Sequence, residues 1–212
     1  MKFCSYTIKC DAGFVPNPFW DYCTLAHCTP NHMGVKLNIG DWVMGTSASS
    51  YGNTLIYAME VSEKIYFNDY FNDSRFQKKK PDLGGTWKEE CGDNIYYLAP
   101  SGEWQQAPSL YHASPEENLQ DTKHPYVYVS ERFWYFGENA IEIPNEFQPL
   151  IRKCQGCKIN HPPETIKGFT NWIQSNYKIG IHGLPRDRDK NVSCGMKGRE
   201  KDKPNQSCHP QT

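Results

Sequence analysis

The sequence predicts an α+β protein built around a small mixed β-barrel with a few flanking helices. Several short segments are rich in β-branched and aromatic residues, which favour strands. Turn-forming Gly, Asn, Ser and Pro residues separate these segments. The 212 residues also include 29 Phe, Trp and Tyr residues, as many as Leu, Ile and Val together. Large aromatic side chains pack well on pleated surfaces, so this composition also favours sheets over helices.

The strands are predicted in order along the chain from these patterns. Residues 2–9 alternate between two faces, as an opening strand does. Residues 39–46 predict a turn followed by a short buried strand. Residues 54–66 give the strongest strand signal of the chain, because β-branched and aromatic residues dominate the segment. The remaining predicted strands cover residues 94–98, 126–130 and 133–136.

Two helices are predicted. Residues 68–77 carry spaced aromatic residues and predict a short one. Residues 162–177 predict a longer one, because Pro162 and Pro163 stand at its start and apolar residues recur near one face. Gly180 lies beyond its expected end.

Charge divides the chain near residue 183. Residues 1–183 contain 16 Lys and Arg against 20 Asp and Glu, whereas residues 184–212 contain 7 against 4. The second segment also has almost no large apolar residues. We therefore expect one domain over residues 1–183 and a basic, flexible tail over residues 184–212. The net charge of −1 excludes a protein that coats nucleic acid with a generally basic surface.

The cysteines and the apolar runs predict a cytoplasmic protein without a membrane partner. No apolar run approaches the roughly 20 residues of a membrane span, and the first ten residues lack a signal-peptide core. The nine cysteines are odd in number, so we expect free thiols and no disulfide framework. No cofactor is expected, with one exception. Cys154, Cys157 and His161 have a spacing that can hold a structural zinc ion, and the alternative is a pair of half-buried free thiols.

A proline-rich loop over residues 11–28 carries many of the candidate binding residues. Pro16 and Pro18 stiffen the loop, and four aromatic rings ride on it. Such a loop is suited to stacking on a flat heterocycle while polar side chains read its edge. The alternative is that the rings plug one end of the barrel.

The predicted ligand-binding residues combine this loop with later strands. Thr46 follows a glycine at a strand end, where a ligand can approach closely. Asp93 points a carboxylate into the cavity or caps a turn. The full predicted set is Phe14, Asn17, Phe19, Trp20, Tyr22, Thr24, Thr46, Asp93, Phe133 and Tyr135.

Four residues are candidates for catalysis. His112 and Asp121 lie on predicted loops between strands, where a histidine near an aspartate can act as a general base. Cys23 is a candidate nucleophile on the aromatic loop, and Asp11 is a second candidate acid or base. The chain lacks the G-x-G-x-x-G, Walker, G-x-S-x-G, H-E-x-x-H and zinc-deaminase motifs. Enzymes that depend on these motifs are therefore disfavoured.

Several blocks of the sequence resemble the family called nucleotide modification associated domain 2. The most specific is DAGFVPNPFWDYCTLAHCTP, residues 11–30. Later blocks that look similar are residues 39–46, 55–59, 92–96, 121–123, 133–137 and 181–185. The resemblance implies a role beside phage and bacterial genes that handle modified DNA bases. The chain is then expected to act in a bacterial host cell, encoded either by the bacterium or by a phage.

The strand that begins with Gly40-Asp41-Trp42, together with residues 55–66, also resembles PUA-like domains of the PUA, ASCH, EVE and YTH types. This resemblance implies a PUA-like barrel that holds a nucleobase, often a modified one. We therefore expect a protein that binds a nucleobase, a nucleotide or a flipped-out DNA base in an aromatic pocket. One alternative is an enzyme of base modification or nucleotide hydrolysis. Another is a phage protein that sequesters a nucleotide immune signal.

Overall fold

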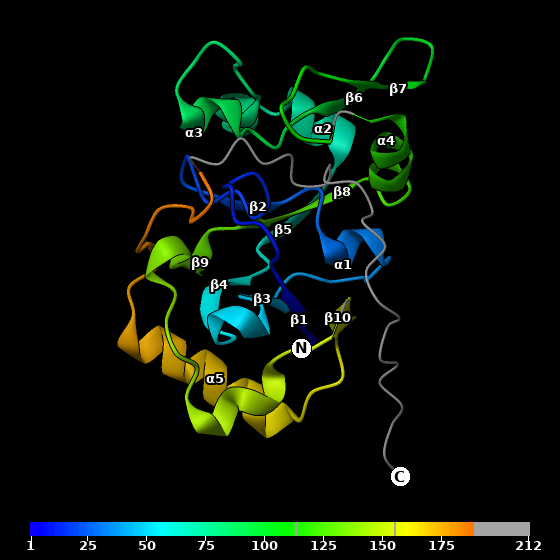
Figure 1. The fold of residues 1–212 in the computed structure, drawn as a ribbon. Helices are drawn as coiled ribbons and strands as arrows, with labels where there is room; N and C mark the ends of the chain where they lie inside the picture. The colour runs from blue at the N-terminus through cyan, green and yellow to red at the C-terminus, as the bar shows by residue number, and fades with distance from the viewer. Residues whose placement is uncertain (113, 155, 189–212) are drawn as a thin grey trace, which may run out of the picture.

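The computed structural model of the chain describes residues 1–112, 114–154 and 156–188 (Figure 1). Helices and strands are mixed along the chain, so the α+β class is confirmed. Within the described residues, the strands form separate sheets of six, three and two strands and no closed barrel.

The six-stranded sheet has the order β10-β1-β3-β4-β9-β11. Strand β1 pairs in parallel with β3, and β9 with β11, whereas the other neighbours are antiparallel. Phe3 lies opposite Trp42 in the β1–β3 pair. The six strands are β1 (Phe3–Thr7), β3 (Trp42–Thr46), β4 (Leu55–Glu60), β9 (Arg132–Tyr135), β10 (Cys157–Lys158) and β11 (Gly180–Ile181).

The three-stranded sheet has the order β2-β8-β5 and is antiparallel, with β2 (Cys23–Leu25), β8 (Tyr126–Ser130) and β5 (Glu63–Tyr66). Strands β6 (Tyr96–Leu98) and β7 (Trp104–Gln106) form a hairpin. The single strand predicted over residues 54–66 is wrong, because β4 and β5 belong to different sheets. At the crossing, the Val61 amide donates to Asp41 and the Ser62 amide to Val129.

The α-helices are α1 (Thr29–His32), α2 (Phe67–Asn72), α3 (Trp87–Glu90), α4 (Pro115–Thr122) and α5 (Pro163–Asn176). Helix α5 confirms the prediction over residues 162–177. The helix predicted over residues 68–77 is broken instead, because Asp73 is extended and its side chain accepts a hydrogen bond from the Arg75 amide. The 3₁₀ helices are η1 (Ser49–Tyr51), η2 (Ser74–Lys79), η3 (Gly137–Asn139) and η4 (Asn145–Leu150).

The elements stack in layers, with α5 at one end and α2, α3 and the β6–β7 hairpin at the other (Figure 1). Helix α5 packs Phe169 onto one face of the six-stranded sheet, where Trp42 and Trp134 stack. The opposite face of that sheet packs on β2 and β8. A third apolar cluster joins the far side of β8 to α2, through Phe67 and Tyr96 among others. Strand β2 and the loops around it therefore lie between two packed layers.

Residues 184–188, the start of the predicted tail, are held against the domain. Asp11 and Asp187 are joined by two hydrogen bonds. The Asp11 amide donates to the Asp187 carboxylate, and the Asp187 amide donates to the backbone carbonyl of Asp11. The amide of Arg186 donates to the Asp11 carboxylate. The rest of the predicted basic tail, from residue 189, lies outside the described residues.

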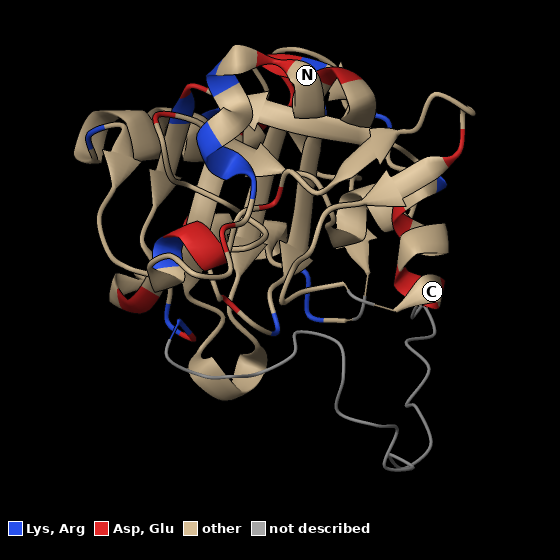
Figure 2. Cartoon of the chain, turned by 90° about the horizontal axis from the view of Figure 1, so that it is seen from above, with Lys and Arg blue, Asp and Glu red and all other residues tan. Residues whose placement is uncertain are grey.

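The charged residues of both signs are interspersed along the chain (Figure 2). In the part of the chain that the structure describes, none of the helices has the length and apolar character to cross a membrane. Among the described residues, six cysteines are free, at positions 4, 23, 28, 91, 154 and 157. Cys10 is disulfide-bonded, so the expectation of free thiols fails at that position.

Candidate functional site

A cavity of about 1120 Å³ opens beside the end of β1, the loop after it and helix α1. The lining residues that matter for its chemistry are Lys9, His27, His32, His112 and Lys153. The described lining residues include no aspartate and no glutamate. The surface of the cavity is therefore suited to an anionic ligand.

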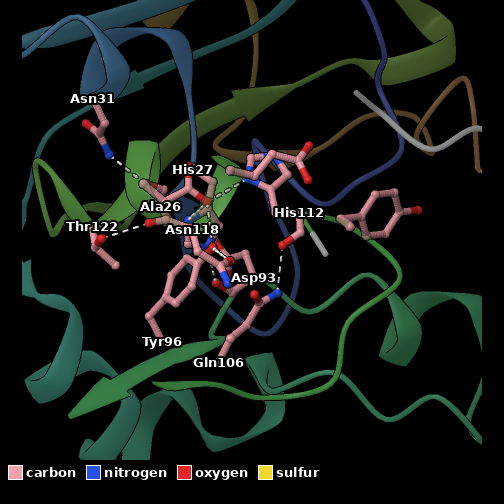
Figure 3. Close-up of polar contacts among 12 residues, drawn as sticks. Ala26, His27, Asn31, Asp93, Tyr96, Gln106, His112, Asn118 and Thr122 are labelled. Carbon is pink, nitrogen blue, oxygen red and sulfur yellow. Dashed lines mark hydrogen bonds and ion pairs between the residues drawn. The ribbon is translucent and has the colours of Figure 1, made fainter. Parts of the chain in front are cut away.

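Three histidines converge on one buried carboxylate at the wall of this cavity. The nearest nitrogens of His32 and His112 lie 2.6 Å and 2.7 Å from the carboxylate oxygens of Asp121. The Nδ1 atom of His27 lies 3.4 Å from the oxygen Oδ2. The Tyr96 hydroxyl lies 3.0 Å from the same oxygen. Figure 3 shows His27, Tyr96 and His112 gathered in one cluster.

Short structural elements bring these side chains together. His27 follows β2, and His32 is the last residue of α1. Asp121 lies near the end of α4, a helix that starts with a capping box between Ser114 and Glu117. His112 precedes this helix with a φ of 54°, a left-handed conformation. Gln106 of β7 donates a hydrogen bond of 2.8 Å to the His112 carbonyl and fixes this turn (Figure 3).

The hydrogen bonds of His27 define its tautomer. Its Nε2 atom lies 2.8 Å from the backbone carbonyl of Asp93, which can only accept, so Nε2 carries the proton. In the neutral ring, Nδ1 then presents a lone pair. This atom is buried and has no hydrogen-bond partner among the described residues. A lone pair and a carboxylate oxygen therefore face each other across 3.4 Å.

Burial and charge set opposite protonation states in the cluster. Burial lowers the pKa of His27 to about 4, although the Asp121 carboxylate opposes this shift. Burial alone would raise the pKa of Asp121, but the hydrogen bonds from His112 and His32 stabilise the carboxylate and hold that pKa well below its usual range. At neutral pH the cluster therefore contains a carboxylate beside a neutral His27 ring.

A second buried network supports His27 from behind. The carboxylate of Asp93 accepts hydrogen bonds from Thr24 at 2.7 Å and Tyr70 at 2.8 Å. The fully buried Lys79 ammonium donates to the Asn17 side chain at 2.9 Å and to nearby carbonyls. Burial lowers the pKa of Lys79 to about 8, and the negative charge of Asp93 opposes that shift. Asp93 thus links a charged core network to the ring of His27.

Phe14 joins the cavity to the aromatic loop. Its ring is stacked between Tyr111 and His27, with centroid distances of 4.7 Å and 5.3 Å. Both faces of the Phe14 ring are thus covered by neighbouring rings. Phe14 holds the orientation of His27 and presents its edge to the cavity.

Among the sequence-predicted residues, the structure brings Phe14, His112 and Asp121 together at the cavity. The others from the aromatic loop lie elsewhere. Asn17 contacts Lys79, whereas Phe19 and Trp20 lie against the ammonium of Lys88. The remaining loop residues, Tyr22, Thr24 and the later Asp93, surround the buried Lys79 network.

The other candidates are packed inside the domain. Cys23 and Phe133 belong to the core between the two larger sheets. Thr46 is buried in β3. The ring of Tyr57 packs against the adjacent Gly45, so there is no open space beside this glycine for a ligand. The hydroxyl of Tyr135 donates to the Asp11 carboxylate, and this pair anchors residues 186–187. These remaining candidates are not among the residues that line the cavity.

The three predicted zinc ligands have separate neighbours. The Cys157 sulfur lies 3.8 Å from that of Met33. His161 contacts the Ser5 hydroxyl at 3.2 Å and the Lys158 carbonyl at 3.1 Å. Cys154 lines the cavity.

His27 and His32 were not predicted as site residues, although they complete the cluster. His27 lies within residues 11–30, the block with the most specific family resemblance, and His32 lies two residues after it. Neither stands beside an acidic residue in the sequence. Their sequence positions carry no signal for the site, although three of the seven histidines meet at one aspartate in the fold. Only the fold brings Asp121 to them.

Comparison with known proteins gives one match. The family model described as nucleotide modification associated domain 2 matches residues 1–192. No curated protein and no solved structure matches the chain.

Proposed function

The chain belongs to the nucleotide modification associated domain 2 family, and from this membership we propose that it binds a nucleotide or a flipped-out, modified base in the cavity beside Asp121. One observation carries the proposal. The described residues that line a cavity of about 1120 Å³ include lysines and histidines and no aspartate or glutamate, and the Asp121 carboxylate lies behind the histidines. This volume lies just above the usual range of about 300–1,000 Å³ for small-molecule sites and accommodates a base together with its sugar and phosphate.

In this proposal the lysines and the histidines recognise different parts of the nucleotide. Lys9 and Lys153, which are exposed, attract the phosphate. His32 and His112 offer ring nitrogens to the polar edge of the base, because their side chains remain 22% and 11% exposed. A PUA-like barrel stays an analogy, and the proposal does not depend on it.

The phosphate contacts give the first testable prediction. We expect the double variant Lys9→Gln/Lys153→Gln to bind nucleoside monophosphates roughly tenfold more weakly, because two partly solvated ion pairs are lost. Binding of the matching nucleosides is expected to change less than twofold. Isothermal titration with both ligand series measures the difference.

The matched control is Lys78→Gln/Lys167→Gln, which removes the same charge from two exposed lysines away from the cavity. An equal loss of affinity in the control would refute a phosphate site at the cavity. The salt dependence of the affinity distinguishes a base within DNA from a free nucleotide as the ligand. Affinity for DNA falls steeply as ionic strength rises. Free-nucleotide binding without DNA binding would instead favour sequestration of a nucleotide signal.

The histidine cluster favours a second candidate function, an enzyme that acts on the bound base or nucleotide. A buried carboxylate that orients histidines at a cavity wall is an arrangement used for general acid–base catalysis. We expect His112→Asn to abolish conversion of a bound nucleotide, followed by chromatography and mass spectrometry, while the chain stays folded. Asparagine is chosen because it tolerates the left-handed backbone of residue 112. If wild-type protein binds a nucleotide and leaves its mass unchanged, binding alone is supported.

A further inference from the structure

The cluster at Asp121 has an unmet requirement that is independent of any nucleotide. The buried Nδ1 atom of His27 has no hydrogen-bond partner among the described residues and faces the Asp121 oxygen Oδ2. Two atoms that can only accept are brought together in a site of low polarity, which is unfavourable unless a cation lies between them. The side chain of His27 is 1% exposed and that of Asp121 is fully buried, so bulk water does not relieve this contact.

We propose that His27, His112 and Asp121 bind one divalent first-row transition-metal ion at the wall of the cavity. Their ligand atoms lie within 4.8 Å of one another. Two imidazole nitrogens and one carboxylate oxygen form a donor set that suits ions such as Zn²⁺ and Fe²⁺.

The distances fit a small rearrangement around an ion. In a tetrahedral site with ligands at about 2.0–2.1 Å, neighbouring ligand atoms lie about 3.3 Å apart. The distance of 3.4 Å between His27 Nδ1 and Asp121 Oδ2 already matches this value. The distance of 2.7 Å from His112 Nδ1 to the same oxygen must widen. The hydrogen bond from Gln106 holds the backbone turn of His112, so the shift falls on its side chain.

The surrounding hydrogen bonds also fit a metal site. A histidine that binds a metal commonly donates its other ring proton to a carbonyl, and His27 does so to Asp93 at 2.8 Å. His32 holds the second oxygen of Asp121 at 2.6 Å and is a positioning residue. Tyr96 lies within 2.7 Å of the Asn118 side chain, so its hydroxyl has another acceptor when Oδ2 binds the ion.

The cavity side of the cluster defines what the ion does. Three protein ligands leave a coordination position open, and His27 and His112 both line the cavity. One carboxylate and two neutral imidazoles leave a divalent ion with a net charge of +1. The open position therefore attracts an anionic or oxygen-bearing ligand from the cavity.

Cobalt(II) titration of the full, chelator-stripped chain tests the proposal, because Co²⁺ reports its ligands by visible absorption. We expect one Co²⁺ per chain, displaceable by Zn²⁺, without the near-ultraviolet charge-transfer band of a thiolate ligand. His112→Asn is expected to weaken binding by about 100-fold or more, since loss of a ligand costs more than loss of a supporting residue. His161→Asn, the same substitution outside the cluster, is expected to leave affinity unchanged, as is Cys154→Ser/Cys157→Ser.

X-ray absorption of the zinc-loaded wild-type chain provides a test that needs no variant. Nitrogen and oxygen scatterers alone at about 2.0–2.1 Å support the site, whereas sulfur at about 2.3 Å places the ion on cysteines and overturns it. Failure of wild-type protein to bind Co²⁺ or Zn²⁺ stoichiometrically also overturns it. Neither readout involves a nucleotide, so this result and the test of the nucleotide proposal are independent.

Discussion

Replacing Asp93 with asparagine is expected to lower the free energy of unfolding by about 3 kcal/mol. The Asp93 side chain is fully buried and offsets the charge of the equally buried Lys79 ammonium. Asparagine keeps the shape and one acceptor oxygen, which serves either the Thr24 or the Tyr70 hydroxyl, while its amide nitrogen faces the other hydroxyl. It also leaves the Lys79 charge uncompensated in the core. Urea denaturation at pH 7 measures the loss.

A double-mutant cycle identifies the cause of that loss. We expect Asp93→Asn/Lys79→Met to be less destabilised than the sum of the single variants, because removing both charges leaves neither unpaired. Asp73→Asn is the matched control, since Asp73 pairs with Arg75 near the surface, and its cost should stay below about 1 kcal/mol. Additive losses in the cycle would show that Asp93 and Lys79 do not interact.

Replacing Asn31 with aspartate is the second large effect, with an expected loss of about 3 kcal/mol or more. The Asn31 side chain is buried, and its amide nitrogen lies 2.8–3.1 Å from the carbonyls of Leu25, Ala26 and Tyr126. Figure 3 shows its contact with Ala26. Aspartate places a negative oxygen where three acceptors converge.

The Asn31 prediction also concerns the site. Asn31 ties α1 to β2 and β8, and the next residue, His32, is the one that contacts Asp121. Thermal and urea unfolding of Asn31→Asp are compared with those of Asn176→Asp, whose amide donates to a single carbonyl at an exposed position. Losses that agree within about 0.5 kcal/mol would contradict the assigned role of Asn31.

Local patterns predicted part of the fold well. Strand β8 and helix α5 lie where the sequence places them, because each has an internal pattern that its own residues satisfy. The break between β4 and β5 was not predicted, since the run of β-branched and aromatic residues continues through Val61 while the chain changes sheets. Strand β2 is only three residues long and depends on its pairing with β8, so no local signal defines it.

The site was predictable to a smaller extent. His112 and Asp121 were both named as candidates from their place on predicted loops, but the sequence alone does not show that they meet. His27 joins them through the packing of β2 against β8 and the hydrogen bond to Asp93, both long-range contacts. The prediction of stacking rings over residues 11–28 rested on composition, which does not distinguish a ring that lines a cavity from one that covers Lys88. Whether a ring lines the cavity depends on how deeply the fold buries it and on which side chains pack around it.

The contact between Asp11 and residues 186–187 bears on how the protein is produced in shortened form. A fragment that stops at residue 183 would leave the Asp11 amide and its buried carboxylate without the Asp187 and Arg186 partners. Asp11 begins the loop that leads to Phe14, which lines the cavity. Loss of the contacts between Asp11 and residues 186–187 would therefore make this part of the cavity lining less well held. The smallest fragment that keeps these contacts therefore extends at least to residue 187.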